Sequence, residues 1–359
     1  MCKNDAANEA RARSNQIDKI IKKDKKSEKD TNSIKILLLG SGESGKSTIL
    51  KQFKLLYGTG FTDTDYVAFR LAALSNLAVC MKILIREANA RKLLPREPTT
   101  DVRVNAVLAL PDIFSETPGE QIVQPETSAA IQSLWKLPAI QEVFALSHEF
   151  QLPDCCAYFM DNCARLCDAN YKVTEQDALY VRIMTSSISE NRFRINDIDY
   201  RIYDVGGQRS ERKKWMHYFD NVHGVLFVSA VGSYDQVIME DSQTNRMEES
   251  IKVFETVCNH PLMMKIPMLI FYNKIDLLEQ KLKDPTKPLK KYFPDFDEPN
   301  DMEHAQGYFK KRFIAVNQSP ARIMYHYFTQ ATDTRQIKTI LNMVTLSIMQ
   351  LDMATTGIM

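Results

Sequence analysis

The chain has 359 residues, of which 44% are hydrophobic and 25% charged, and its net charge is +1. This length allows two domains with ordinary hydrophobic cores, and the small net charge argues against whole-chain attraction to nucleic acid. The first residues lead into charge, so we expect no signal peptide, and no stretch approaches the roughly 20 apolar residues of a membrane span. Four of the seven cysteines cluster at 155–167 without a C-x-x-C spacing. They fit small core residues of a reduced, cytosolic protein better than a zinc site.

Residues 1–33 are highly charged, with nine lysines and arginines against six acids and neither proline nor glycine. This composition favours a helix, but its apolar content is too low for the segment to dock firmly by itself. A solvated or disordered arm is the plain alternative. The sharper interpretation is an extended helix that takes a partner and touches anionic lipid.

A phosphate-binding pattern organises the next part of the chain. An apolar, partly β-branched run at 34–39 leads into Gly40-x-x-x-x-Gly45-Lys46-Ser47, followed by helix-forming residues. Glycines let the backbone bring its N–H groups close to a polyphosphate, and the following helix adds its positive dipole end. Lys46 can reach the β- and γ-phosphates, and the Ser47 hydroxyl can ligate Mg²⁺. The alternative is a glycine turn without a ligand, which the complete lysine–serine ending disfavours.

The segment after this unit is predicted to be helical throughout. Gly58 and Gly60 interrupt the first helix. Apolar residues then recur at spacings of 4, 3, 4, 3 and 4, which marks one face of a long helix. These residues are Val67, Leu71, Leu74, Ala78, Met81 and Ile85, and shorter helical stretches divided by prolines follow around 128–146, 154–168 and 174–182. Because no alternating strand pattern is visible from 64 to 176, we expect a helical block inserted after the first strand–helix unit.

Strands and helices alternate in the rest of the chain. Strand patterns and apolar runs lie at 192–198, 200–203, 224–230, 267–272, 313–316 and 324–328, and helical stretches lie near 209–219, 241–259, 302–311 and 333–352. Such alternation predicts an α/β fold with a mainly parallel sheet covered on both faces.

A second motif, Asp204-Val-Gly-Gly-Gln208, follows a predicted strand. An acid at a strand end can hold Mg²⁺ directly or through water, Gly207 can offer its N–H to a γ-phosphate, and Gln208 is placed to orient an attacking water. Asp-x-Gly-Gly alone is a common turn. Together with the phosphate loop it indicates nucleotide hydrolysis.

A third motif, Asn273-Lys-Ile-Asp276, follows the apolar run at 267–272. The Asp276 carboxylate can accept from two adjacent N–H donors on the guanine edge, where adenine offers an acceptor instead. Open α/β sheets bind ligands at the carboxyl ends of their strands. Ala331, which follows the last predicted strand, could close over the base with its backbone N–H. The motif therefore favours guanine over adenine nucleotides.

These motifs, in this order around a helical insertion, resemble the α subunits of heterotrimeric G proteins over almost the whole chain. The resemblance rests on residues 46–48, 204–208, 209–215, 245–247 and 331–334. It implies a Ras-like P-loop GTPase domain, α/β with a mostly parallel six-stranded sheet flanked by helices, and an inserted all-helical domain. The implied parts are an N-terminal helix or arm at 1–33, the GTPase domain at 34–60 and 182–359, and the helical domain at 61–181.

The resemblance also assigns roles that spacing alone does not. Arg182 would be an arginine finger carried in cis, and Thr185 would join Ser47 as a metal ligand for Mg²⁺. Without the resemblance, Arg182 is better explained as a surface arginine at a helix end. The implied catalytic residues are Gln208 and Arg182, and the implied GDP- and GTP-binding residues are Glu43, Ser44, Gly45, Lys46, Ser47, Thr48, Leu179, Arg182, Asp204, Gly207, Asn273, Lys274, Asp276 and Ala331.

The implied function is a signalling switch that hydrolyses GTP slowly and couples a seven-transmembrane receptor to effectors. Segments near 182–190, 204–219 and 233–246 would tighten on the γ-phosphate and relax after hydrolysis. Their surface would alternately bind a βγ dimer and effector or GTPase-accelerating regulator proteins, with Lys213, Lys214 and Trp215 as candidate contacts. The expected place is the cytoplasmic face of the plasma membrane, as a peripheral protein with a cytosolic pool, and without a nucleic-acid partner.

The chain departs from the family in places. Position 2 is not glycine, so N-myristoylation is unsupported, whereas Cys2 could carry a palmitoyl chain that anchors weakly. Tyr180, Met184 and Ser187 replace the family's usual basic residue, lysine and glycine, which could alter contacts with regulators. These changes keep open a nucleotide-bound scaffold with negligible turnover. A P-loop kinase or ATPase is a third interpretation, which Asp276 argues against and a preference for ATP would revive.

Overall fold

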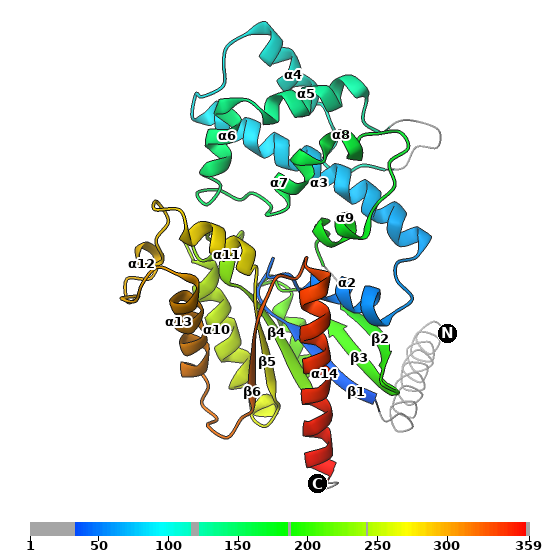
Figure 1. Cartoon of the computed structure of the whole chain (residues 1–359), viewed down its shortest axis with the longest axis vertical. Coiled ribbons are helices and arrows are strands. Elements are labelled where there is room, and N and C mark those ends of the chain that lie inside the picture. Colours follow the sequence, from blue (N-terminus) through cyan, green and yellow to red (C-terminus); the bar gives the residue numbers. More distant parts are fainter. Residues whose placement is uncertain (1–32, 116–121, 186–187, 242, 357–359) are drawn as a thin grey trace, which may run out of the picture.

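The computed structural model describes residues 33–115, 122–185, 188–241 and 243–356, and side chains up to residue 347. The predicted arm at 1–33, with Cys2, lies outside the described residues apart from its last position. Figure 1 shows two blocks: an all-helical one at the top and a sheet flanked by helices below it. A cavity described below lies between them.

The sheet has six strands in the order β2-β3-β1-β4-β5-β6. Five strands are parallel, and β2 alone runs antiparallel to β3. Their bounds are β1 (Ser33–Leu39), β2 (Ser189–Ile195), β3 (Ile198–Asp204), β4 (Gly224–Ala230), β5 (Met268–Asn273) and β6 (Met324–Thr329). The predicted α/β fold with a mostly parallel six-stranded sheet is therefore confirmed. Asn196 and Asp197 both have positive φ, 49° and 63°, which is the conformation of a tight two-residue hairpin turn.

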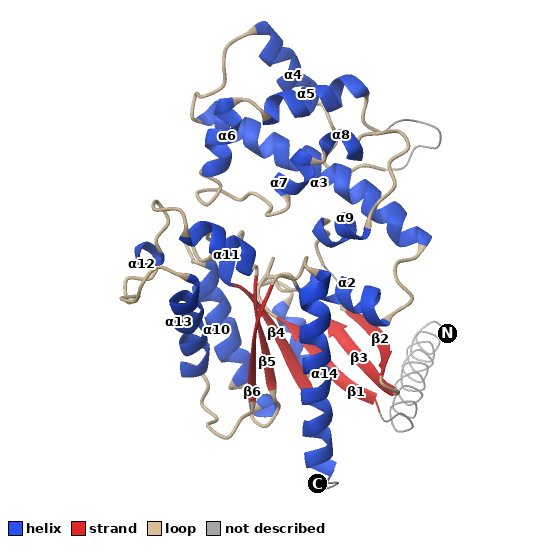
Figure 2. Cartoon of the chain, in the orientation of Figure 1, coloured by secondary structure: helices blue, strands red, loops and turns tan. Residues whose placement is uncertain are grey.

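Helices cover both faces of the sheet (Figure 2). One face packs against α2 (Lys46–Tyr57) and α14 (Thr334–Thr356), and the other against α10 (Arg246–Cys258) and α13 (Met302–Ala315). The remaining elements of this block are α11 (Ile275–Leu282), α12 (Leu289–Tyr292) and the short 3-10 helices η1 (Arg212–Tyr218), η2 (Val231–Ser233) and η3 (Pro261–Met263). Alternate residues of β1 point to opposite faces, so Ile36 and Leu38 join one core while Leu37 and Leu39 join the other.

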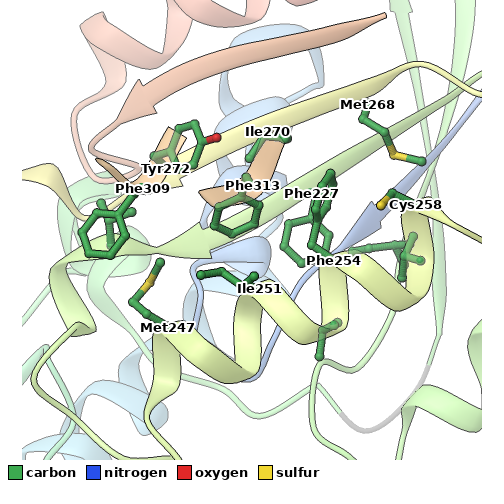
Figure 3. Packing of buried hydrophobic residues seen from close by; sticks show 14 of the residues in the cluster. Phe227, Met247, Ile251, Phe254, Cys258, Met268, Ile270, Tyr272, Phe309 and Phe313 are labelled. Atoms are coloured by element: carbon green, nitrogen blue, oxygen red, sulfur yellow. The ribbon is translucent and has the colours of Figure 1, made fainter. Parts of the chain in front are cut away.

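An aromatic cluster fills the core on the α10 and α13 side (Figure 3). Phe254 lies 5.0 Å from Phe227 and 5.2 Å from Phe313 between ring centroids, and Tyr272 lies 5.4 Å from Phe313. Edge-to-face and tilted contacts of this kind add to the stabilisation from buried area. The cluster joins two neighbouring strands, β4 and β5, to both covering helices.

The prediction of a strand at 313–316 is wrong. Residues 313–315 form the end of α13, Val316 is its C-cap, and Phe313 is a buried core residue of that helix. A four-residue apolar run fits a strand and a buried helical turn equally well, so periodicity could not separate them. The prediction near 209–219 was also inexact, since only 212–218 form a helix and it is of the 3-10 type.

The upper block is built around one long helix, α3 (Asp63–Ala90). Around it lie α4 (Pro98–Leu108), α5 (Pro125–Trp135), α6 (Pro138–Ala145), α7 (Cys156–Asp161), α8 (Cys163–Leu166) and α9 (Glu175–Tyr180). Of the predicted stripe, Leu74, Ala78, Met81 and Ile85 are buried, whereas Val67 is 40% exposed. Among the described helices, α3 alone has the length and hydropathy of a membrane span. The expectation that no stretch approaches the length and hydropathy of a membrane span was thus too strict. In the structure α3 packs as the core helix of this block.

The clustered cysteines belong to the same core. Cys155, Cys156, Cys163 and Cys167 are all buried among apolar residues of the helical block. Sγ of Cys163 lies 4.0 Å from Sγ of Cys167, one helical turn away. Their packing matches the interpretation as small core residues.

Candidate functional site: a cavity between the two blocks

A cavity of about 420 Å³ lies at the carboxyl ends of β1 and β5. The lower block lines it with residues 42–48, 51, 207–208, 273–274, 276–277 and 331–332, and the helical block and its exit segment add 154–155, 157–158 and 179–185. A mononucleotide is an appropriate occupant for a cavity of this size. All predicted binding and catalytic residues except Asp204 line it, and Asp204 lies behind Ser47.

The phosphate loop is shaped by close backbone approaches. Gly45 has φ of +102°, and a Cβ there would collide with the Asn273 side chain. Lys46 is buried, and its Nζ donates to the carbonyl oxygens of Gly40 and Ser41 at 3.0 and 2.8 Å. Burial lowers the pKa of Lys46 to about 8, against the opposing effect of Asp204. The Lys46 ammonium therefore rests on carbonyl oxygens of the phosphate loop, from which it can move to bind an anionic ligand.

Three oxygen-bearing side chains meet beside the loop. Ser47 Oγ lies 2.9 Å from Thr185 Oγ1, and it donates to Asp204 Oδ2 at 3.3 Å. The other carboxylate oxygen, Asp204 Oδ1, is buried and has no hydrogen-bond partner within the described part of the chain. Burial raises the pKa of Asp204, and Lys46 opposes that shift. Hydroxyls and a carboxylate with a spare oxygen form the donor set that Mg²⁺ prefers, so these residues fit the ion.

The Asp204–Gln208 turn lies against the phosphate loop. A Cβ on Gly207 would meet Lys46 Nζ and the carbonyl oxygens of Ser41 and Gly40. Only a glycine fits at this close approach. Gln208 lies on the next position, and its Cγ would be 3.5 Å from a Cβ added to Gly42. The turn thus brings Gln208 to the cavity wall beside the loop.

Arg182 enters the cavity from the segment that leaves the helical block. Its backbone N–H donates to Asn76 Oδ1 at 2.8 Å, and its carbonyl accepts from Asn76 Nδ2 at 3.1 Å. Its guanidinium donates to Glu43 Oε1 at 2.9 Å. The other Glu43 oxygen accepts from Arg246 at 2.8 Å. One carboxylate of the phosphate loop therefore holds two arginines.

Asn273 joins three motifs at the far end of the cavity. Its Nδ2 donates to the Ser44 carbonyl at 2.9 Å, and its Oδ1 accepts from the Ala331 N–H at 2.9 Å and from Thr329 Oγ1 at 3.2 Å. The sequence predicts that the Ala331 N–H faces a base, whereas in the structure it donates to Asn273. The side chain of Asn273 is thus a structural link between the phosphate loop and the last strand.

Asp276 and Lys274 line the same end. Burial raises the pKa of the Asp276 carboxyl, and the backbone N–H of Leu277 opposes the shift. Lys274 has a left-handed φ of 64° and pairs through Nζ with Asp154 of the helical block. The carboxyl group therefore faces the cavity beneath an ion pair that joins the two blocks.

Two further predicted residues touch across the blocks. Thr48 Oγ1 donates to the Leu179 carbonyl at 3.5 Å. Ser44 Oγ instead bonds within the loop, to the Ser41 carbonyl at 3.0 Å.

Comparison with known proteins fits this geometry. The family model of the G-protein alpha subunit matches residues 11–348. The chain belongs to the G-protein α-subunit family. It is 38% identical over 350 residues to a guanine nucleotide-binding protein subunit alpha of Cryphonectria parasitica, covering 98% of this chain and 97% of that one. It is 39% identical over 350 residues to the Sporothrix schenckii subunit, with the same coverage, and 36% identical over 359 residues to the alpha-17 subunit of Caenorhabditis elegans, covering 100% and 99%.

Membership makes the chain a guanine-nucleotide-binding GTPase with a role in signal transduction. Sequence reasoning on this α subunit nevertheless missed several cavity residues, namely Lys51, Asp154, Cys155, Tyr158 and Tyr180. The rings of Tyr158 and Tyr180 stack with centroids 3.9 Å apart and planes 5° from parallel. No local motif marks these residues, because Lys51 lies on α2 beyond the phosphate-loop pattern and the others come from the helical block and reach the cavity only in the folded chain.

One candidate partner contact is corrected. Trp215 is buried, and its Nε1 donates to the Gly206 carbonyl at 2.9 Å, so it cannot meet a partner in this conformation. Lys213 and Lys214 are exposed, and Lys214 pairs with Glu211. Those two lysines remain candidate contacts.

Proposed function

We propose that this chain is a switch that binds GDP and GTP with Mg²⁺, hydrolyses GTP slowly, and couples a seven-transmembrane receptor to effectors as part of a heterotrimer with a βγ dimer. The observation that carries the proposal is the convergence, on one cavity, of phosphate-loop groups, a cluster of oxygen donors and the Asp276 carboxyl.

In this proposal each group acts on a different part of the substrate. The phosphate-loop N–H groups and Lys46 hold the β- and γ-phosphates, and Asp276 accepts from the guanine edge. Ser47 and Thr185, with Asp204 behind them, would hold Mg²⁺, which when bound neutralises charge on the phosphates. Selectivity for guanine follows because Asp276 can accept hydrogen bonds but cannot donate them when ionised.

Hydrolysis needs two further groups at the γ-phosphate. Gln208 orients the attacking water, and Arg182 stabilises charge that develops on the transferred phosphoryl group. Arg182 must leave Glu43 to do so, since its guanidinium is bonded there. The Gly207 N–H and the Thr185 hydroxyl lose their phosphate-dependent contacts after hydrolysis, which releases both segments.

The surface beside the cavity supports the proposed protein partners. Ile183, Met184, Met216 and Met239 are 46–61% exposed and lie on the switch segments. Exposed methionine and isoleucine side chains are adaptable apolar contacts of the kind that bind proteins. We assign βγ, effector and regulator binding to this surface, and a peripheral position on the cytoplasmic face of the plasma membrane with a cytosolic pool.

The test is to purify the chain, extract its bound nucleotide and identify it by chromatography. We expect GDP or GTP, and stabilisation in a thermal melt by added GDP or a non-cleavable GTP analogue that depends on Mg²⁺. An empty protein that responds to neither nucleotide, or one that prefers ATP, contradicts the proposal. A single-turnover assay then measures hydrolysis, and a rate indistinguishable from that of free GTP would leave a nucleotide-bound scaffold instead.

A further inference from the structure

We propose that Lys51 is a positioning residue for Arg182: from the helix that follows the phosphate loop, it fixes the chain segment that carries the arginine. The inference rests on the proposed role of Arg182 in hydrolysis. It assigns to Lys51 no contact with the reacting atoms.

The contact geometry is specific. Lys51 Nζ donates to the carbonyl oxygens of Ala178 and Val181, both at 2.7 Å. These carbonyls lie at the end of α9, where the last turn of a helix leaves its acceptors without partners and a cation is favoured. Val181 directly precedes Arg182. The ammonium therefore fixes the backbone one residue away from the arginine.

The environment makes this bond hard to break. The Lys51 ammonium also lies 5.2 Å from the centroid of the Phe69 ring, on α3. Burial lowers the pKa of Lys51 to about 8, with a smaller rise from Cys155 and a smaller fall from Lys54. Lys51 is half-buried at the cavity wall, and losing both carbonyls would leave its ammonium with poorer acceptors, which is costly.

The other end of α9 is anchored separately. Asp177, in its first turn, accepts from Arg165 at 2.6 and 2.7 Å, from Tyr158 at 2.7 Å and from the Thr174 N–H at 2.8 Å. All these donors belong to the helical block. The start of α9 is therefore held by the helical block, while Lys51 holds its end to α2, the helix that follows the phosphate loop. Asn76 of α3 bonds the Arg182 backbone directly, so Lys51 acts together with Asn76 in setting where Arg182 lies relative to a bound phosphate.

A double-mutant cycle tests the inference. The variants are Lys51→Met, Arg182→Cys and the two combined, in the full chain, assayed for single-turnover GTP hydrolysis and for affinity towards a non-cleavable GTP analogue. Lys54→Met is the matched control, because it removes a lysine from the same helix and no bond from Lys54 to α9 occurs among the described residues. We expect Lys51→Met to slow hydrolysis about tenfold, since small misplacements of a catalytic group cost one to two orders of magnitude. We expect its affinity to stay within about threefold, and the control to match the wild type.

The decisive result is non-additivity. If Lys51 acts through Arg182, the double variant hydrolyses GTP no more slowly than Arg182→Cys alone. If the rate losses of the two single variants multiply in the double variant, the inference is overturned. It is also overturned if Lys51→Met hydrolyses GTP at the normal rate but releases GDP faster, because Lys51 would then act by holding the two blocks together. A parallel loss of affinity would make it a direct ligand.

Two further results keep the test decisive. If Lys51→Met does not fold, the same cycle is run with Lys51→Gln, whose amide keeps a donor and should lose less of the rate. If Arg182→Cys alone leaves the rate unchanged, the proposed role of Arg182 fails, and with it the inference. If Arg182→Cys is slow and Lys51→Met is not, only the inference fails.

Discussion

The guanidinium of Arg182 donates to the Glu43 carboxylate at 2.9 Å, and Arg246 donates to the other oxygen of the same group at 2.8 Å. The arginine proposed for catalysis thus rests on the phosphate loop itself. The pair is partly exposed, with 29% of the Arg182 side chain and 14% of the Glu43 side chain accessible. Partly exposed ion pairs are worth about 1 kcal/mol or less, so Arg182 can exchange this partner for a phosphate.

Arg182→Cys and Glu43→Gln should therefore behave differently. Loss of the arginine should slow single-turnover hydrolysis by about 10³-fold or more, a magnitude that comes from this very family rather than from this structure. Glu43→Gln should change the rate by no more than about fivefold, because it weakens the contacts with Arg182 and Arg246 but keeps one acceptor oxygen. Phosphate release after rapid mixing measures both rates. A Glu43→Gln variant as slow as Arg182→Cys would show that Glu43 itself takes part in the chemistry.

Gln208→Leu should leave GTP binding largely intact and slow hydrolysis by about 10²-fold or more, because leucine cannot orient a water molecule. The measurement is single-turnover phosphate release, with affinity for a non-cleavable GTP analogue as the control. An unchanged rate would remove Gln208 from the mechanism.

Asp276→Asn should change the preferred base from guanine to xanthine. An asparagine amide can donate to the C2 oxygen of xanthine, but it cannot accept from both guanine donors, so affinity for GTP should fall by about 10³-fold or more while xanthosine triphosphate gains. Competition binding measures both. Glu279→Gln, on the exposed side of the same helix α11, is the matched control. Equal affinity for GTP in Asp276→Asn would place the base elsewhere.

Two histidines should give the unfolding free energy opposite dependences on pH. Burial lowers the pKa of His326 to about 4, so its contribution is present above the unfolded pKa of about 6.5 and is lost as the pH falls towards 4. Hydrogen bonding to Asp301 raises the pKa of His304, so its contribution is present below about 6.5 and is lost as the pH rises through the raised pKa.

Chemical denaturation of His326→Gln and His304→Gln between pH 5 and 8 tests this pair. Relative to wild type, the first variant should lose less stability on acidification and the second should lose less on alkalinisation. Parallel curves for wild type and both variants would refute the assignments.

The sequence predicted most of the lower block because its signals are local. β4 and β5 are largely apolar runs, and the phosphate loop and Asp204–Gln208 turn need glycines where backbones touch, as at Gly45 and Gly207. The strand predicted from Phe313 onwards was wrong because a short apolar run has no periodicity that separates a strand from a helix. Trp215 misled because a residue in a charged stretch was taken for surface, although its indole reaches the core.

The helical half of the cavity could not be predicted in this way. Asp154 meets Lys274, and Lys51 meets Val181, across 120 and 130 residues of sequence. Neither pair has a spacing or motif, since each depends on how two separately folded blocks are placed. Arg182 was assigned only by resemblance, and the structure brings it to Glu43 across 139 residues.

The cavity walls come from two bodies that are joined by two chain crossings, near 58–62 and 181–185. An occupant is therefore contacted from both sides, and pairs such as the one between Asp154 and Lys274 hold the two walls together. We expect the lifetime of the bound state to depend on how often the two bodies separate. A protein that grips only the outer surface of either body can shorten or lengthen that lifetime without ever touching what lies inside.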